Sequence, residues 1–158
     1  MTRETKEELI QQVIYAARAN EAAVDRFDAL ATAALGVNRT DARCLDIVQN
    51  EGGSITAGRL AELSGLTTAA VTTVVDRLEA RGYVRRLPDP VDRRRVLVEL
   101  TPLLLERTEA IWGPIRADAQ PALDRMTMDE LRAVKRWFEI SREVNEGQLD
   151  RVRGLRFD

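Results

Sequence analysis

Residues 55–100 combine a helix-turn-helix pattern with two strand-like runs, and this combination limits the fold more than any other feature of the chain. Thr56 and Thr67 each stand where a side chain can cap a helix, and Gly65 lies between the two helices, where a positive φ is needed. Apolar Val71 is placed to hold the second helix against the first. An αα-hairpin in an ordinary core shows the same pattern, so this pattern alone leaves DNA binding open.

The residues that follow predict a wing. Gly82 ends the second helix, and the runs YVRRL and RVLVEL, joined by PDPVDRR, are rich in strand-forming residues. Val96, Val98 and Leu100 alternate as in a strand with one buried face. A helix-turn-helix followed by a two-stranded hairpin is a winged helix. The predicted fold class is therefore mainly α with a small β-hairpin wing.

Long helical patterns flank this segment on both sides. Apolar residues recur at helical spacing over about 5–35 and again after Thr101-Pro102, and a capping box begins at Thr127. We expect a single domain over 1–158, with a winged helix-turn-helix lobe at 37–100 and a helical lobe at 1–36 and 101–158.

The charge distribution is uneven. The formal net charge of the chain is −2, yet residues 76–95 hold seven arginines and four acidic residues, a balance of +3, which leaves −5 for the other 138 residues. A positive segment in a negative chain is typical of a nucleic-acid site.

Several residue types that enzymes and metal sites use are missing. The chain has no histidine and one cysteine, Cys44, and it contains no GxxxxGK[ST] or GxGxxG loop. We therefore expect no enzyme activity, no cofactor and no metal site. The sequence offers no membrane-length apolar run and no signal-peptide pattern, and the single cysteine fits a reducing compartment, so we expect a cytoplasmic protein. Cys44 is interpreted as a small buried hydrophobe rather than a redox sensor.

The segment GRLAELSGLTTAAVTTVVDRLEARGYVRRLPDPVDRRRVLVELT resembles the winged-helix core of MarR-type transcriptional regulators. The Leu-Ala…Gly-Leu turn, the VDRLEARGYVRR run and the DRRRVLVELT wing carry the resemblance over residues 57–101, whereas the flanking helices match by order and length only. The resemblance implies a dimeric transcription factor whose terminal helices interleave with those of a partner. The apolar surface of these helices favours a dimer too, the alternative being that they pack on each other within a monomer.

By this resemblance the second helix of the pair enters the major groove and the wing approaches the minor groove. Asp92 is predicted to brace Arg94 in the minor groove, while Asp76 and Glu79 are predicted to be salt-bridge partners of nearby arginines. For Thr67 capping is the main alternative role, and for the arginines outside the wing tip it is solvated surface. The predicted DNA-binding set is Thr67, Thr68, Ala69, Thr72, Thr73, Arg77, Arg59, Arg85, Arg86, Asp92, Arg93, Arg94 and Arg95.

The predicted function is that of a sequence-specific DNA-binding transcriptional regulator, a ligand-responsive repressor that binds an inverted-repeat operator as a homodimer. The resemblance implies a small aromatic or phenolic effector, and the candidate residues for it, for which core or surface roles are the alternative, are Tyr15, Arg18, Trp112 and Met126. The alternative function is a winged-helix protein-interaction module whose basic wing binds an acidic protein partner.

Overall fold

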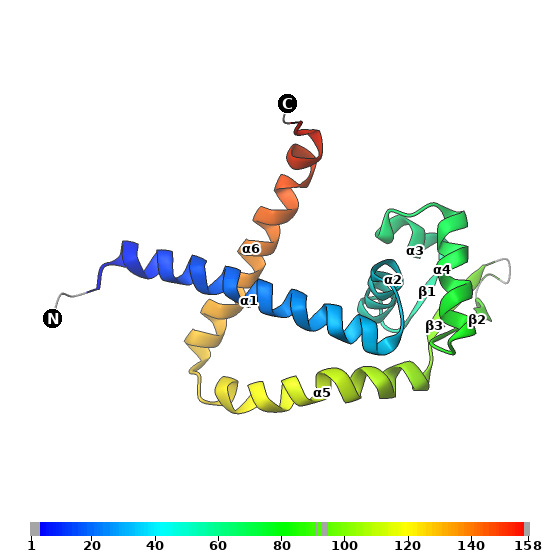
Figure 1. The fold of residues 1–158 in the computed structure, drawn as a ribbon, viewed down its shortest axis with the longest axis horizontal. Coiled ribbons are helices and arrows are strands. Elements are labelled where there is room, and N and C mark those ends of the chain that lie inside the picture. Colours follow the sequence, from blue (N-terminus) through cyan, green and yellow to red (C-terminus); the bar gives the residue numbers. More distant parts are fainter. Residues whose placement is uncertain (1–3, 91, 93–94, 157–158) are drawn as a thin grey trace. The chain divides into compact units, whose positions relative to one another are not determined.

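The computed structural model describes residues 4–90, 92 and 95–156. In chain order the elements are α1 (Lys6–Leu35), α2 (Arg39–Asn50), β1 (Ser54–Thr56), α3 (Ala57–Ser64), α4 (Thr68–Ala80), β2 (Val84–Pro88), β3 (Val96–Leu100), α5 (Pro102–Asp124) and α6 (Met128–Gly154) (Figure 1). The predicted fold class is confirmed, because a mainly helical chain carries one small antiparallel sheet.

The chain divides into two compact units, Met1–Ile111 and Trp112–Asp158, with the boundary inside α5. The first unit contains every element from α1 to β3 and the start of α5. The division predicted from sequence, which groups residues 1–36 with 101–158 in one dimerisation lobe, stays a prediction.

The sheet of the first unit has three strands where the sequence predicted two. Strands β2 and β3 form the expected antiparallel hairpin, and β1 pairs with the other side of β3, with Ile55 opposite Val98. Ile55 is buried, and the Leu100 amide donates to the Gly53 carbonyl just before β1, at 2.9 Å. Strand β1 has only three residues, too few for an alternation to stand out in the sequence.

Local capping sets the ends of the helix-turn-helix. The Thr56 side chain accepts from the Arg59 amide at the start of α3, and the Thr67 side chain accepts from the Ala70 amide at the start of α4. Gly65 ends α3 with a φ of 69°, a conformation that glycine adopts without a steric penalty. These three predictions are confirmed, and together they fix the direction in which α4 leaves the turn.

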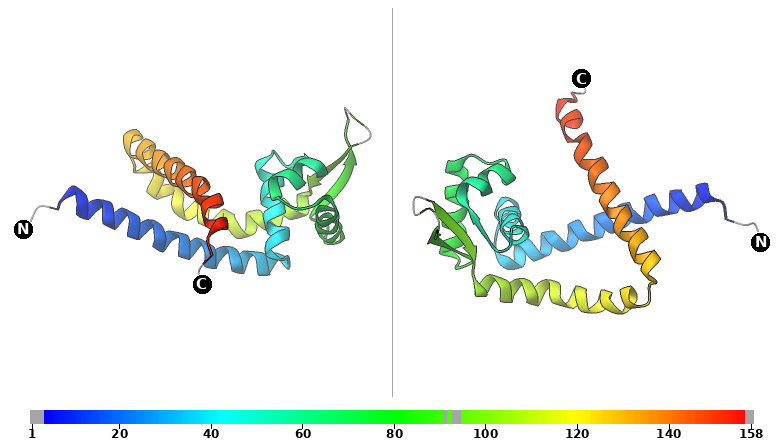
Figure 2. Two further views of the ribbon diagram at one scale, coloured as in Figure 1. Left: turned by 90° about the horizontal axis from the view of Figure 1, so that it is seen from above. Right: turned by 180° about the vertical axis from the view of Figure 1, so that it is seen from behind.

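The core of the first unit lies between the three short helices and the sheet. Helix α4 contributes four buried side chains, Val71, Val74, Val75 and Leu78. Leu60 of α3 and Val98 of β3 are each 1% exposed. Full burial of such a side chain contributes roughly 1.5–3 kcal/mol, so α4 is firmly held in place. In the left view of Figure 2 the β2–β3 hairpin extends beyond the short helices α2, α3 and α4.

The second unit is built from the rest of α5 and from α6. Helix α5 continues through Pro114 and Pro121, and α6 begins at a capping box in which Thr127 and Glu130 bond each other's backbone amides. The residues of α6 are all described and none of them is buried.

Candidate nucleic-acid interface

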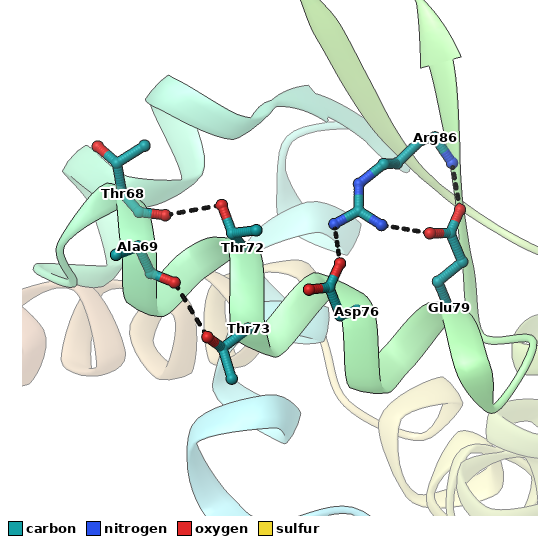
Figure 3. Close-up of polar contacts among 7 residues, drawn as sticks. All are labelled: Thr68, Ala69, Thr72, Thr73, Asp76, Glu79 and Arg86. Carbon is teal, nitrogen blue, oxygen red and sulfur yellow. Dashed lines mark hydrogen bonds and ion pairs between the residues drawn. The ribbon is translucent and has the colours of Figure 1, made fainter.

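The first half of α4 presents an uncharged, threonine-rich face. Residues 67–75 contain no charged and no amide side chain, and Thr68, Ala69, Thr72 and Thr73 are all exposed. The Thr72 hydroxyl donates to the Thr68 carbonyl at 3.0 Å, and the Thr73 hydroxyl donates to the Ala69 carbonyl at 3.1 Å (Figure 3). A threonine side chain in a helix can bond the carbonyl four residues earlier, and both of these side chains adopt the rotamer that does so.

At the other end of α4, the Arg86 side chain ties the wing to the helix. Its Nη2 lies 2.5 Å from Oδ1 of Asp76, and its Nη1 donates to Oε2 of Glu79 (Figure 3). The backbone amide of Arg86 also donates to Oε1 of Glu79, at 3.2 Å. Burial lowers the pKa of the Arg86 guanidinium, but the hydrogen bonds to Asp76 and Glu79 outweigh this effect and raise the pKa above its usual value. The prediction that Asp76 and Glu79 pair with a nearby arginine is confirmed for Arg86.

Arg77 makes a bidentate ion pair with α2. Its Nε and Nη2 lie 3.1 and 2.5 Å from the two carboxylate oxygens of Asp41, which is only 2% exposed. Charge-assisted bidentate pairs are strong and directional, so Arg77 anchors α4 on α2. Its hydrogen bonds to Asp41 raise the pKa of the guanidinium. No local pattern in the sequence pointed to Asp41, because 36 residues separate the two partners. A contact between Arg77 and DNA stays a prediction.

The other described arginines of the predicted set also have carboxylate partners. Arg59 pairs with Glu62 at 2.9 Å and more loosely with Glu51 at 3.7 Å, and Arg85 pairs with Glu99 at 2.5 Å across the β2–β3 hairpin. Exposed pairs of this kind are worth about 0–1 kcal/mol, so phosphates can displace the carboxylates at little cost.

At the wing tip, Nε of Arg95 lies 3.4 Å from Oδ2 of Asp92. The Asp92 amide donates to Oδ1 of Asp89 at 3.2 Å, and the Asp89 amide donates to the Arg95 carbonyl at 3.1 Å. The predicted partner of Asp92, Arg94, lies outside the described residues, and so does Arg93. Arg95 is thus one partner of Asp92, and the brace on Arg94 stays a prediction.

A junction around Tyr83, which the sequence analysis missed, joins three elements of the first unit. The buried Tyr83 hydroxyl donates to the Leu35 carbonyl at the end of α1, at 2.8 Å, and accepts from Nη1 of Arg107 on α5, at 2.5 Å. The Arg107 guanidinium carbon lies 5.4 Å from the centre of the Tyr83 ring. Thr101 completes the junction, because its amide and hydroxyl donate to the Tyr83 and Gly82 carbonyls, at 3.0 and 2.6 Å. The base of the wing is thereby fastened to two long helices.

The candidate effector residues fall into two groups. Tyr15 and Arg18 line an open hollow along α1, and the Tyr15 residue is 79% exposed. Trp112 and Met126 both belong to the second unit. All four stay candidates.

Three further features bear on other functions. Cys44 is 1% exposed, and burial raises the pKa of its thiol, as expected for a small hydrophobe. Within the described part of the chain no group of three acidic, cysteine or histidine side chains is placed to hold a metal ion. Nor does any helix among the described residues have the length and apolarity that crossing a bilayer requires.

Comparison with known proteins gives concordant matches. A family model described as "MarR family" matches residues 35–95. The HTH-type transcriptional regulator YcgE of Bacillus subtilis (strain 168) is 32% identical over 152 residues, which cover 96% of this chain and 98% of that protein.

Two solved structures share the fold. RV1404 from Mycobacterium tuberculosis has a TM-score of 0.61 at 24% identity and covers 90% of this chain and 96% of its own. Wild-type MarR from E. coli in its apo form has a TM-score of 0.54 at 24% identity and covers 89% of this chain and 98% of its own.

Proposed function

The chain belongs to the MarR family of transcriptional regulators, and we propose that it is a repressor that binds an inverted-repeat DNA operator as a homodimer. The observation that carries the proposal is the surface formed by α4 and the wing. An uncharged helix face suited to base edges lies on the same helix that Arg86 ties to an arginine-rich hairpin. Such a regulator acts in the cytoplasm, where the bacterial chromosome lies.

The exposed apolar residues of the terminal helices support the homodimer. Leu9 and Val13 of α1 are 49% and 42% exposed, and Phe138 and Val144 of α6 are each 59% exposed. Apolar side chains spaced along a helix in this way favour association with a second apolar surface. A two-fold axis then places two α4 helices on half-sites about one helical turn, or roughly 34 Å, apart.

Salt dependence of duplex binding tests the proposal. The full-length chain is used to select a binding site from a random duplex pool, and fluorescence anisotropy then gives the affinity at 50 and 200 mM salt. If several arginines exchange carboxylates for phosphates, the affinity falls on the order of 10³-fold or more over this range, because condensed counterions are released on binding. Failure to select any duplex, or an affinity that is the same at both salt concentrations, would contradict the proposal and favour an acidic protein partner.

We also propose that a small aromatic or phenolic effector releases the DNA, with Tyr15 and Arg18 as the first residues to test. An exposed phenol ring beside a guanidinium offers stacking and charge to an aromatic carboxylate. Hydroxybenzoates are titrated into the preformed complex, with wild type and Arg18→Ala compared. Release that is weakened by Arg18→Ala supports this site, whereas equal release by the two proteins would contradict it.

A further inference from the structure

The two threonine hydroxyls at the centre of the exposed α4 face have already used their hydrogens. A threonine hydroxyl has one hydrogen to donate, and those of Thr72 and Thr73 go to carbonyls of their own helix. Figure 3 shows both hydroxyl oxygens directed along the helix toward these carbonyls. Each side chain therefore offers DNA its methyl group and an accepting oxygen, but no donor.

The two arginines nearest to this face are held by carboxylates. Residues 67–75 contain no lysine, arginine, asparagine or glutamine. Further along α4, the Arg77 guanidinium is held on both oxygens of Asp41, and Arg86 is held between Asp76 and Glu79. Guanine shows only acceptors in the major groove, so reading it requires a donor. The hydroxyls of Thr67 and Thr68 are further donors in this stretch, and they lie at its start. The centre of the exposed α4 face, at Thr72 and Thr73, is therefore poorly suited to guanine.

The groups that remain match thymine. The 5-methyl group of thymine is the one apolar feature that a base presents in the major groove, and alanine and threonine methyl groups are suited to contact it. Ala69, Thr72 and Thr73 present three such methyl groups on one exposed stretch of α4. Burial of a methyl group between two surfaces is favourable without any hydrogen bond.

We propose that Thr72 and Thr73 are specificity-determining residues that read thymine through their methyl groups, so that the half-site under the first half of α4 is rich in A·T pairs. This inference rests on the proposed function, because it assumes that α4 lies in the major groove. The accepting oxygens offer a competing chemistry, since adenine and cytosine present amino groups to them. The experiment below separates the methyl group from the oxygen.

The test uses paired substitutions in the full-length chain. Thr72→Val and Thr73→Val keep a methyl group in the same place and remove the hydroxyl, whereas Thr72→Ser and Thr73→Ser keep the hydroxyl and remove the methyl group. The probe is the duplex that the wild-type chain selects from a random pool, made once with thymine and once with deoxyuridine, which lacks the 5-methyl group. Circular dichroism confirms that each variant is folded.

We expect the valine variants to bind the thymine duplex within about twofold of wild type. Each serine variant should bind about fourfold more weakly per half-site, the value of one buried methyl group. Replacing thymine by deoxyuridine should lower the affinity of the wild-type chain by a similar factor. It should lower the affinity of the serine variants less, because their methyl contact is already absent.

Three outcomes overturn the inference. They are a tenfold loss with the valine variants, a selected half-site without thymine, and an affinity that does not change with deoxyuridine. Each of these leaves DNA binding intact, and so leaves the proposed function standing. Failure to enrich any duplex would instead contradict the proposed function, and the inference with it.

Discussion

Helices α4 and α6 are both amphipathic, but they satisfy their apolar sides in different ways. Four of the 13 residues of α4 are buried, whereas none of the 27 residues of α6, all of them described, is buried. Helices in proteins gain most of their stability from packing of an apolar face. The first unit therefore holds α4, the helix that we propose reads DNA, by itself, and α6 gains the same kind of stability only by covering its apolar side. In the proposed function, α4 therefore serves DNA reading and α6 serves assembly.

The largest expected effect comes from making the apolar side of α6 polar. The double variant Phe138→Asp/Val144→Asp should dissociate the proposed dimer. Each change occurs in both subunits, so the dimer loses two aromatic and two aliphatic side chains from its interface, worth roughly 6 kcal/mol together. Sedimentation velocity at low micromolar concentration gives the assembly state, and Phe138→Leu serves as the control that keeps an apolar side chain. A stable dimer of the double variant would contradict this use of α6.

The next largest effect comes from a buried side chain of α4, compared with an exposed one of α6. Leu78 of α4 is 1% exposed, so Leu78→Ala should lower the free energy of unfolding by about 3 kcal/mol through lost contacts and a cavity. Leu149 of α6 is 51% exposed, and Leu149→Ala should cost less than about 0.5 kcal/mol under conditions where the chain is monomeric. Urea unfolding at several protein concentrations measures both. Equal costs in dilute solution would show that α6 is packed as firmly as α4.

The sequence predicted features whose cause is local. Thr56, Thr67 and Gly65 interact with neighbours within three residues, so these residue types are enough to predict the helix ends and the turn. The winged helix followed from these and from the alternation in β3, of which Val98 and Leu100 are buried as expected, whereas Val96 at the start of the strand is 44% exposed.

Contacts between distant segments were not predictable in this way. The Tyr83 hydroxyl meets a carbonyl 48 residues away, and Arg77 meets Asp41 at a separation of 36, and no local pattern specifies either partner. The ion pair with Asp41 does not test the predicted contact between Arg77 and DNA. The position of Arg77 on α4 was foreseen, but the carboxylate that holds it was not.

The Tyr83 junction gives a third, intermediate effect. Tyr83→Phe removes the donor to the Leu35 carbonyl and the acceptor of Arg107 while keeping the ring in place. We expect a loss of about 1–2 kcal/mol in the free energy of unfolding, the usual cost when a buried carbonyl loses its partner. Tyr15→Phe, at a residue that is 79% exposed, is the matched control and should change stability little. A Tyr83→Phe variant as stable as the control would show that the junction contributes nothing to holding the wing base.

The smallest effect belongs to the contact between α1 and α2, where Asp46 loses hydration. Asp46 is an exposed residue, but desolvation by its neighbours raises the pKa of its carboxyl, and the negative charge of Asp28 on α1 raises it further. A raised pKa in the folded state means that this group favours folding below its unfolded pKa, and that this contribution is lost as the pH rises through the folded value.

Asp46→Asn should therefore stabilise the protein near pH 7, by less than about 0.5 kcal/mol, and the gain should vanish as the pH falls below about 4. Asp150→Asn on α6, where the carboxylate pairs with Arg153 at 2.8 Å and its side chain is 94% exposed, should bring no gain at either pH. Urea unfolding at both pH values compares the two variants. A gain at Asp46 that persists at low pH would point to side-chain packing rather than charge, because a protonated aspartate and an asparagine then carry the same charge.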